Sequence, residues 1–401
     1  MAKILYLAHR IPYPPNKGDK IRSWHFLKHI MDHHDVSLGY FVDDPDDREH
    51  MAFLKQKSRQ HCAIERSPAQ MKMTALWGFL KGTPLSIEAY NSKDMYDFVR
   101  HQVDAIGVEA IYVFSSAMAQ FVMPFAGKIP IVMDFCDVDS AKWSAYSFEA
   151  SLLNRFVYGR EGRKLAAYET AVSKAVDQSV FVSEAEVDFF VSRQTGDFKA
   201  VITSLPNGVD CAYFDTAAID VAQPEVPCVS FTGAMDYKPN VDAIVWFLDH
   251  CWVSVRKAIP TAELYIVGGK PAPALRSVNG KNGIVITGRV DDVRPYIASS
   301  QAVIAPLQIA RGIQNKVLEA MAMSRPVVAT SEAFTGIEAV MGEDIIIADT
   351  PVVFTDAVIA LLSDTGYGDQ MGKMARASVL ENHSWPVSYA KLDTILGALL
   401  K

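Results

Sequence analysis

The sequence predicts an α/β protein built from two domains, each with a parallel β-sheet covered by helices on both faces. Three observations support this prediction. The chain has 401 residues, which is more than one hydrophobic core usually organises. Short, almost continuously apolar segments alternate with segments of helical length along the whole sequence. A polar stretch at residues 205–227, which holds three prolines, separates two such series.

The apolar segments are expected to be strands of two parallel sheets, because helices between them allow parallel crossovers. These segments are residues 3–8, 36–42, 110–114, 129–135, 178–183, 227–233, 262–268, 283–288, 301–307, 325–330 and 344–348. We expect a Rossmann-like domain over residues 1–204 and a second one over 205–385, with a last helix at 386–401 that packs back on the first domain. Ligands of such domains bind at the carboxyl ends of the strands.

Composition and charge narrow the possible classes of function. The net charge of −7 argues against nucleic-acid binding, which needs a basic surface. The five cysteines form no C-x-x-C pair, so we expect a reduced protein rather than a disulfide scaffold or a zinc site. The amino terminus suits a first strand rather than a signal peptide, and no apolar run approaches the roughly 18 residues of a membrane-spanning helix. We expect a cytoplasmic protein, either soluble or peripheral at the inner face of the membrane.

The segment ARGIQNKVLEAMA, residues 310–322, carries its polar residues on one face of an expected helix. At 100° per residue, Gly312, Asn315, Lys316 and Glu319 fall on one stripe, and the opposite face is apolar. The free amides at the amino end of this helix and its dipole favour an anion, most naturally a phosphate. A carboxylate at Glu319 can accept both hydroxyls of a ribose. The segment thus predicts a nucleotide-diphosphate site, although Lys316 and Glu319 can also form a plain surface pair.

Four stretches resemble glycosyltransferase family 4, whose members are retaining enzymes of the two-domain GT-B fold. They are PLQIARGIQNKVLEAMAMSRPVVAT, FTGAMDYKPNVDAIVWF, SLPNGVD and IPYPPNKGDKIRSWHFL. The opening loop and the stretch DFCDVDSAKW are most similar to the bacterial sugar transferases associated with exosortase (PEP-CTERM) systems. The resemblance covers nearly the whole chain. It implies a GT-B fold and a nucleotide-diphosphate sugar as donor substrate, with no cofactor and no metal.

On the donor side, the resemblance implies contacts from two glycines and from a run of consecutive residues. Gly233 follows the first strand of the second domain, and at Gly288 relatives lay the nucleotide base against the backbone. The consecutive residues are Gly312, Ile313, Gln314, Asn315 and Lys316. Together these residues predict a backbone cradle for the donor nucleotide.

Two positions depart from the family pattern. Arg311 stands where the family has the first of two glutamates, of which Glu319 is the second, and Ala234 replaces an arginine that usually follows the glycine. Lys238 matches the family's phosphate-binding lysine. We hypothesise that Arg311 restores the lost positive charge, because a guanidinium can hold a diphosphate with two hydrogen bonds. Lys238, Arg311 and Glu319 then form the expected catalytic group, unless Arg311 pairs with a surface acid and Lys238 is a solvated loop residue.

The ends of the first-domain strands supply the expected acceptor or phosphate side. His9 ends the first strand, and Gly18 and Arg22 begin the helix that follows, although Arg22 can equally belong to an ordinary βα connection. Relatives often carry a histidine where this chain has Ser115. Asp137 belongs to a D-x-D pair, which we expect to line the acceptor side rather than to bind a metal.

Residues 71–82, MKMTALWGFLKG, mix large apolar side chains with two lysines. A helix of this type either packs in the core or lies at a bilayer interface. The second alternative would make the protein a peripheral membrane protein and would suit a lipid-linked acceptor.

Taken together, the sequence predicts a retaining glycosyltransferase that moves a sugar from a nucleotide-diphosphate sugar to a glycan or lipid-linked acceptor in exopolysaccharide or cell-surface glycan synthesis. The expected partners are the nucleotide sugar and the acceptor, and not nucleic acid. Two alternatives stay open: a nucleotide-sugar epimerase of the same fold, and a non-catalytic member of a polysaccharide assembly system. A hydride-transfer enzyme is not indicated, because no G-x-G-x-x-G follows any expected strand.

Overall fold

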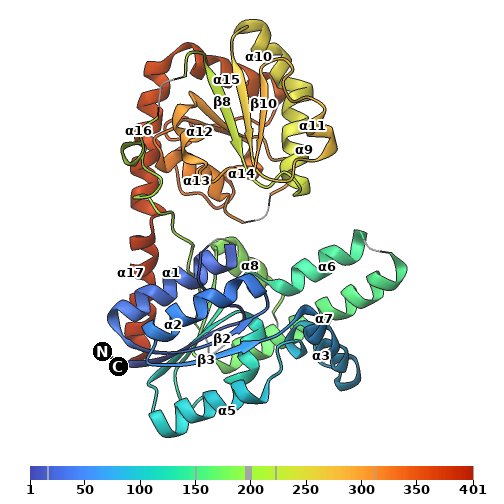
Figure 1. The fold of residues 1–401 in the computed structure, drawn as a ribbon, viewed down its shortest axis with the longest axis vertical. Helices are drawn as coiled ribbons and strands as arrows, with labels where there is room; N and C mark the ends of the chain where they lie inside the picture. The colour runs from blue at the N-terminus through green and yellow to red at the C-terminus, as the bar shows by residue number, and fades with distance from the viewer. Residues whose placement is uncertain (16–17, 150, 195–200, 222–223, 311, 401) are drawn as a thin grey trace. The chain divides into compact units, whose positions relative to one another are not determined.

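The computed structural model describes residues 1–15, 18–149, 151–194, 201–221, 224–310 and 312–400. The chain divides into two compact units (Figure 1). Unit 1 comprises Met1–Pro206 and Tyr389–Lys401, and unit 2 comprises Asn207–Ser388. The sequence analysis set the corresponding boundaries at residues 204/205 and 385/386.

Unit 1 is built on a parallel sheet with the strand order β3-β2-β1-β4-β5-β6-β7. Its strands are β1 (Lys3–Ala8), β2 (Asp35–Val42), β3 (Gln60–Glu65), β4 (Ala110–Phe114), β5 (Ile131–Cys136), β6 (Gln178–Phe181) and β7 (Val201–Ser204). Its helices are α1 (Gly18–His33), α2 (Met51–Lys57), α3 (Pro68–Lys81), α4 (Leu85–Glu88), α5 (Lys93–His101), α6 (Asp139–Glu149), α7 (Leu152–Ala175) and α8 (Glu184–Ser192). Strand β4 is buried along its whole length, as expected for a sheet that is covered on both faces.

The two edge strands of this sheet, β3 and β7, are not among the strands predicted from the sequence. Both strands are only half-buried over most of their length. An edge strand does not need an unbroken apolar run, because one side of it has no neighbouring strand. The periodicity of these segments was therefore too weak to mark them as strands.

Unit 2 is built on a parallel sheet with the strand order β10-β9-β8-β11-β12-β13. Its strands are β8 (Cys228–Thr232), β9 (Glu263–Val267), β10 (Ile284–Gly288), β11 (Ala302–Ala305), β12 (Val327–Ala329) and β13 (Ile346–Ile347). The helices that begin in this unit are α9 (Lys238–Phe247), α10 (Val253–Ala258), α11 (Pro273–Arg276), α12 (Arg294–Ser299), α13 (Asn315–Ala322), α14 (Ser331–Phe334), α15 (Pro351–Ser363), α16 (Thr365–Asn382) and α17 (Trp385–Leu399).

The last helix, α17, passes from unit 2 into unit 1 at Tyr389. Its unit 1 portion lies against α1, where the hydroxyl of Tyr389 is 2.9 Å from Nδ1 of His25 and the carboxylate of Asp393 is 2.8 Å from Nε2 of His29. The Tyr389 and His29 rings are also stacked, with 4.3 Å between their centroids. These contacts fix the carboxy-terminal end of the chain on unit 1.

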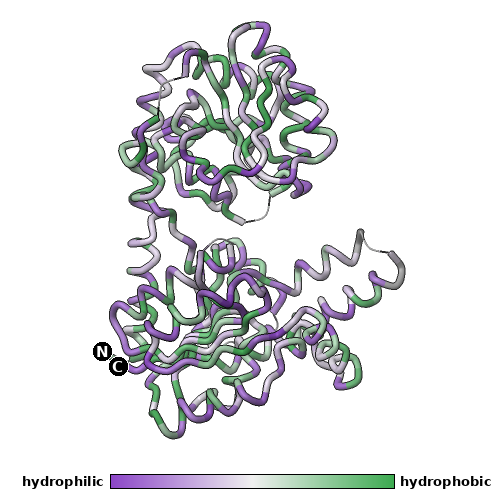
Figure 2. Tube along the Cα trace, in the orientation of Figure 1, coloured by the Kyte–Doolittle hydropathy of each residue, from purple (hydrophilic) through white to green (hydrophobic). Residues whose placement is uncertain are grey.

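In both units the strand order predicts where a binding crevice lies along the carboxyl edge of the sheet. Figure 2 shows apolar residues running along the strands of each sheet, with more polar residues on the surrounding helices. The direction in which successive strands are added across the sheet reverses between β1 and β4 in unit 1 and between β8 and β11 in unit 2. Connections that leave neighbouring strands on opposite faces open a crevice at the carboxyl edge of a sheet.

Candidate functional site

A pocket of about 600 Å³ lies in unit 2 at this reversal point. Its volume is in the range of small-molecule sites in proteins. The carboxyl ends of β8, β9 and β10 and the amino ends of α9 and α13 all contribute to it. The lining residues are Phe214, Thr232, Gly233, Ala234, Tyr237, Asn240, Val267, Gly268, Gly269, Arg289, Val290, Val293, Ile313, Gln314, Asn315, Lys316 and Glu319.

Lys316 presents a positive charge to this pocket, and within the described residues no carboxylate is hydrogen-bonded to it. Its Nζ donates a hydrogen bond to Oδ1 of Asn240, which is a neutral amide, and lies 4.3 Å from the centroid of the Phe231 ring. The Asn240 amide is itself held in place by a 3.0 Å hydrogen bond to the carbonyl of Ala234. Burial lowers the pKa of Lys316 to about 8. The nearby Glu319 carboxylate offsets this shift only in part, so an anion bound close to the ammonium would raise its pKa again.

Glu319 lies on the same face of α13 as Lys316, three residues further along the helix. Within the described residues, its carboxylate makes no hydrogen bond, and burial raises its pKa to about 7. A half-buried carboxylate in a pocket wall can accept hydrogen bonds from hydroxyl groups of a ligand. The wall formed by α13 therefore offers a cation and a hydrogen-bond acceptor side by side.

Two glycines bring bare backbone to the floor of the pocket. A Cβ atom at Gly268 would lie 1.7 Å from the carbonyl oxygen of Gly233, and one at Gly233 would lie 2.7 Å from Nδ2 of Asn240. The same atom at Gly233 would lie 3.1 Å from Nζ of Lys316. A side chain at Gly233 would disturb the hydrogen bond between Lys316 and Asn240, and one at Gly268 would clash with the backbone of Gly233. Glycine is needed here for close packing of backbone around the pocket.

Five of the residues predicted for donor binding line this pocket: Gly233, Ile313, Gln314, Asn315 and Lys316. Glu319, which was predicted in the catalytic group, lines it as well. The expectation that Gly312 lies inside the helix was wrong, because α13 begins at Asn315. Gly312 precedes the helix with a left-handed φ of 67°, a conformation that glycine adopts without steric cost. Gly288 ends β10 with a φ of 71°, and the next residue, Arg289, lines the pocket.

Of the two predicted catalytic cations, Lys238 is not among the lining residues. Lys238 begins α9, its side chain is 82% exposed, and it forms an i,i+4 ion pair with Asp242 one helical turn away. Arg311 lies outside the described residues. Arg289, which was not predicted as a site residue, lies in the pocket wall. Its position directly after the glycine that ends a strand is the signal that would have indicated it.

At the carboxyl edge of the unit 1 sheet, His9 is enclosed by aromatic rings. Its ring centroid is 5.9 Å from that of Tyr90 and 5.6 Å from that of Phe114. Burial lowers the pKa of His9 to about 4, so the ring is neutral at pH 7. Its Nε2 lies 3.7 Å from Asp19, whose carboxylate also pairs with Arg10 at 2.9 Å. His9 can accept a proton only weakly in this setting.

Arg22 does not take the phosphate-binding or acceptor-side position that the sequence analysis considered. Its guanidinium is fully buried and forms an ion pair with Asp134 of β5 at 2.9 Å. It also donates a 2.6 Å hydrogen bond to the carbonyl of Leu205. These contacts make Arg22 a structural link between α1, β5 and the end of the unit 1 chain segment. Gly18, by contrast, is exposed at the first position of α1.

Ser115 and Asp137 lie beyond the ends of β4 and β5, at the same edge of the sheet as His9. Ser115 has a left-handed φ of 78°, and the hydroxyl of Ser116 lies 3.5 Å from the carboxylate of Asp139. Lys142 pairs with Asp137 at 2.7 Å and with Asp139 at 3.2 Å. The D-x-D carboxylates thus share one lysine. Among the described residues, no group of three or more His, Cys, Asp or Glu side chains is arranged to hold a metal ion.

Comparison with known proteins identifies the architecture. Residues 226–364 match the family model of glycosyl transferases group 1. The chain is similar over 100% of its length to 99% of a sucrose-phosphate synthase from Thermosynechococcus elongatus, with 14% identity and a TM-score of 0.68. It is also similar to the Anabaena protein HepE in complex with UDP-glucose, with 14% identity, full coverage of both chains and a TM-score of 0.64. The fold is that of a GT-B glycosyltransferase.

One curated relative extends the comparison to sequence. An uncharacterised 44.6 kDa protein in the cps region of Klebsiella pneumoniae is 23% identical over 371 residues, which is 90% of each chain. The solved structures and the two parallel sheets confirm the GT-B fold expected from the sequence, with two Rossmann-like units. The group 1 match contains every residue of the unit 2 pocket except Phe214.

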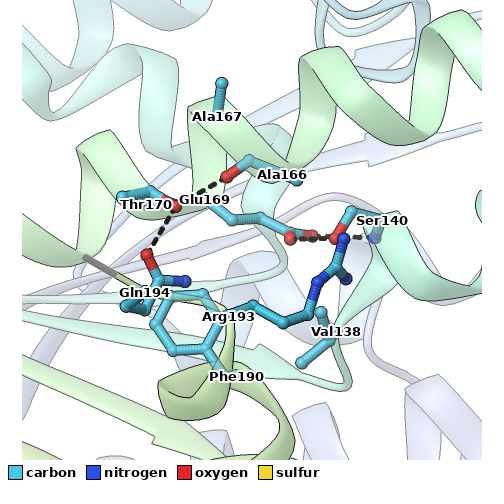
Figure 3. A pocket seen from close by; sticks show the side chains of 9 residues that line it. All are labelled: Val138, Ser140, Ala166, Ala167, Glu169, Thr170, Phe190, Arg193 and Gln194. Carbon is cyan, nitrogen blue, oxygen red and sulfur yellow. Dashed lines mark hydrogen bonds between the residues drawn. The ribbon is translucent and has the colours of Figure 1, made fainter.

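A second pocket, of about 360 Å³, lies in unit 1 of the GT-B fold among α6, α7 and the end of α8 (Figure 3). Glu169 accepts hydrogen bonds from the backbone N–H of Ser140 at 3.1 Å and from the Ser140 hydroxyl at 2.6 Å. Thr170 donates to Gln194 at 2.8 Å. Burial raises the pKa of Glu169 to about 7. Since Glu169 satisfies donors at the amino end of α6, we assign it the structural role of fixing that helix.

Proposed function

We propose that this protein transfers a sugar from a nucleotide-diphosphate sugar to a glycan or lipid-linked acceptor with retention of the anomeric configuration. The observation that carries the proposal is the unit 2 pocket, in which Lys316, hydrogen-bonded to the neutral amide of Asn240, lies beside Glu319 within the region that matches group 1 glycosyl transferases. This pocket combines the features needed to hold a diphosphate and a ribose. The sequence stretches that resemble family 4 and the exosortase-associated sugar transferases support the finer assignment.

In the proposed complex, the donor diphosphate binds at the amino end of α13. The amides of the first helical turn have no carbonyl partner within the helix, and the helix dipole adds positive potential there. Lys316 supplies a full positive charge, and Arg289 is a further cation on the pocket wall. Glu319 accepts the ribose hydroxyls. The bare backbone at Gly233 and Gly268 lets the ligand approach the sheet closely.

The difficult step is cleavage of the bond between the anomeric carbon and the phosphate oxygen. Negative charge develops on the departing diphosphate, and fixed cations and amides that are already in place stabilise it. The acceptor oxygen attacks the same face of the sugar that the diphosphate leaves. The acceptor proton passes to a phosphate oxygen of the donor, so one carbon–oxygen bond forms and one breaks. No metal or cofactor is part of this proposal.

Lys238 and Arg311 remain predictions as diphosphate-binding residues. For Lys238 the prediction requires that donor binding draws its side chain away from Asp242. Replacing a group that stabilises the leaving diphosphate should lower kcat by about 10²–10³. We expect Lys316→Met to show a loss of this size. A Lys238→Ala variant with an unchanged kcat would remove Lys238 from the mechanism.

We propose that the acceptor binds at the carboxyl edge of the unit 1 sheet, near His9, Gly18, Ser115 and Asp137. The Klebsiella relative is a protein of a cps region, which supports a role in cell-surface glycan or exopolysaccharide synthesis. All five cysteines are free thiols, which supports a cytoplasmic location. A lipid-linked acceptor would require the enzyme to reach a bilayer, and residues 71–82 are the proposed contact.

The direct test is incubation of the full-length protein with UDP-, GDP- and ADP-sugars, with and without a glycan or lipid-linked acceptor. Release of free nucleotide that depends on the acceptor, with the product anomer matching the donor in NMR spectra, is the expected result. Epimerised donor without transfer would instead favour the nucleotide-sugar epimerase. Tight donor binding without turnover would favour a non-catalytic member of an assembly system.

A further inference from the structure

Helix α3 exposes an apolar stripe that most helices would bury. Met73, Leu76, Trp77 and Leu80 have exposed fractions between 58% and 78%. Their spacing of i, i+3, i+4 and i+7 places them on one face of the helix. An apolar face of this kind normally packs on a core. The core-packed alternative for residues 71–82 is therefore wrong.

Other contacts hold α3 with this stripe outward. Arg160 of α7 donates hydrogen bonds to the carbonyls of Gly78 at 2.8 Å and Thr83 at 3.2 Å. Its guanidinium also lies 4.7 Å from the centroid of the Phe79 ring. Gly78 is buried, and a Cβ atom there would lie 3.1 Å from the side chain of Leu85. The close packing of the Gly78 side explains why the stripe on the other side of α3 stays in solvent.

The charges around the stripe are positive. Helix α3 contains no acidic residue, and its exposed cations are Lys72 and Lys81. On the neighbouring helix α7, exposed cations occur at Arg155, Arg163 and Lys164, and Nζ of Lys164 would lie 3.9 Å from a Cβ atom at Gly82, next to the end of α3.

Of the cations named above, Lys81 is offset by Glu88, whereas Lys72 of α3 and Lys164 of α7 appear in no ion pair among the described residues. Glu161 of α7 is fully buried and accepts hydrogen bonds from the backbone N–H groups of Leu85 and Ser86. Glu88 is buried and pairs with Lys81. Since the whole chain carries a net charge of −7, this basic surface is a local feature. Long-range electrostatics would turn it towards a negatively charged partner.

We propose that the surface formed by the apolar stripe of α3 and the exposed cations of α3 and α7 docks on a bilayer that contains anionic lipids. The apolar side chains would enter the interface between headgroups and acyl chains, and the lysines and arginines would bind lipid phosphates. A second copy of the chain is a poorer occupant, because face-to-face pairing would bring like charges together. Among the described residues no helix is long and apolar enough to cross a membrane.

The inference deepens the proposed function, since it names anionic lipid as the partner that brings the enzyme to a lipid-linked acceptor. It is tested without sugar donor, by sedimentation of the full-length protein with vesicles of phosphatidylcholine alone or with 30% phosphatidylglycerol. We expect binding to the anionic vesicles that weakens at high salt. The double variant Trp77→Glu/Leu80→Glu should reduce the bound fraction at least tenfold. Val253→Glu is the matched control, because Val253 is a 70% exposed apolar residue of unit 2.

A charge variant separates the two contributions. Lys72→Glu/Lys164→Glu should abolish the preference for anionic over neutral vesicles and leave the melting temperature unchanged. Equal binding of the wild type to both vesicle types, or undiminished binding by the Trp77/Leu80 variant, would overturn the proposal. So would a wild-type dimer that the Trp77/Leu80 variant converts to a monomer in ultracentrifugation. Vesicle binding without sugar transfer would reject the proposed activity and leave the docking surface intact.

Discussion

Lys316 and Glu319 should give donor binding a bell-shaped pH dependence. Burial lowers the pKa of Lys316 to about 8 and raises that of Glu319 to about 7. The diphosphate needs the protonated lysine, and the ribose hydroxyls need the ionised glutamate. Affinity should therefore rise as the pH increases through about 7 and fall as the pH increases through about 8.

The magnitude follows from the displaced pKa of Lys316. A lysine with a pKa of about 8 is roughly nine-tenths protonated at pH 7 and roughly one-tenth protonated at pH 9. Returning its pKa to the ordinary value of 10.5 would stabilise the protonated form of the lysine by about 3 kcal/mol, at 1.36 kcal/mol per pKa unit. If a bound diphosphate achieves this, the dissociation constant should increase up to tenfold per pH unit above about 8.

Isothermal titration with UDP-glucose in two buffers of different ionisation enthalpy measures this coupling directly. At pH 8.5 the free lysine lacks roughly three quarters of a proton, so binding should take up about that amount. Lys316→Met should abolish the proton uptake together with the alkaline limb, and Glu319→Gln should abolish the acidic limb alone. A wild-type affinity that does not change between pH 6 and 9, or binding without proton uptake, would refute the assignment of both residues.

Three further predictions concern the framework of the two units. Gly268→Ala would place a Cβ atom 1.7 Å from the carbonyl oxygen of Gly233. We therefore expect donor affinity to fall at least tenfold and the free energy of unfolding to fall by about 1–3 kcal/mol. Gly397→Ala is the control, because nothing lies within 4 Å of its new Cβ atom, and equal donor binding by both variants would contradict the packing argument. Asp134→Asn leaves the buried charge of Arg22 without its partner and should cost about 3–5 kcal/mol in urea unfolding; a loss below 1 kcal/mol would show that the pair is not needed. Burial raises the pKa of Glu169 from 4.5 to about 7, so between these pH values the folded state keeps a proton that the unfolded state has released. The free energy of unfolding should therefore fall by up to about 3 kcal/mol as the pH rises from about 4.5 to 7. Glu169→Gln should flatten this pH dependence, and an unchanged slope in the variant would show that Glu169 does not cause it.

The parallel sheets and the donor segment could be predicted from sequence because their signals are local. A buried strand needs an apolar run, and a helix needs a 3.6-residue period, whatever else the chain contains. Gly233 and the residues from Ile313 to Lys316 follow strands, so their place at the carboxyl edge of a sheet was implied by order alone. The edge strands β3 and β7 were missed because partial burial relaxes the same signal.

The chemical role of each charged residue depended on contacts that local patterns do not encode. Lys316 is held by Asn240, which is 76 residues away in the sequence, and Arg22 is paired with Asp134, which is 112 residues away. Lys238 finds its own partner one helical turn away.

The sequence alone determined the two α/β units, the order of their strands along the chain and the polar segment beside a strand end. Only the tertiary structure decided which cation enters the pocket, which one is buried in the framework and which apolar helix face stays in solvent. The physical reason is that periodicity acts over a few residues, whereas burial and ion pairing are set by whatever packing brings together from distant parts of the chain.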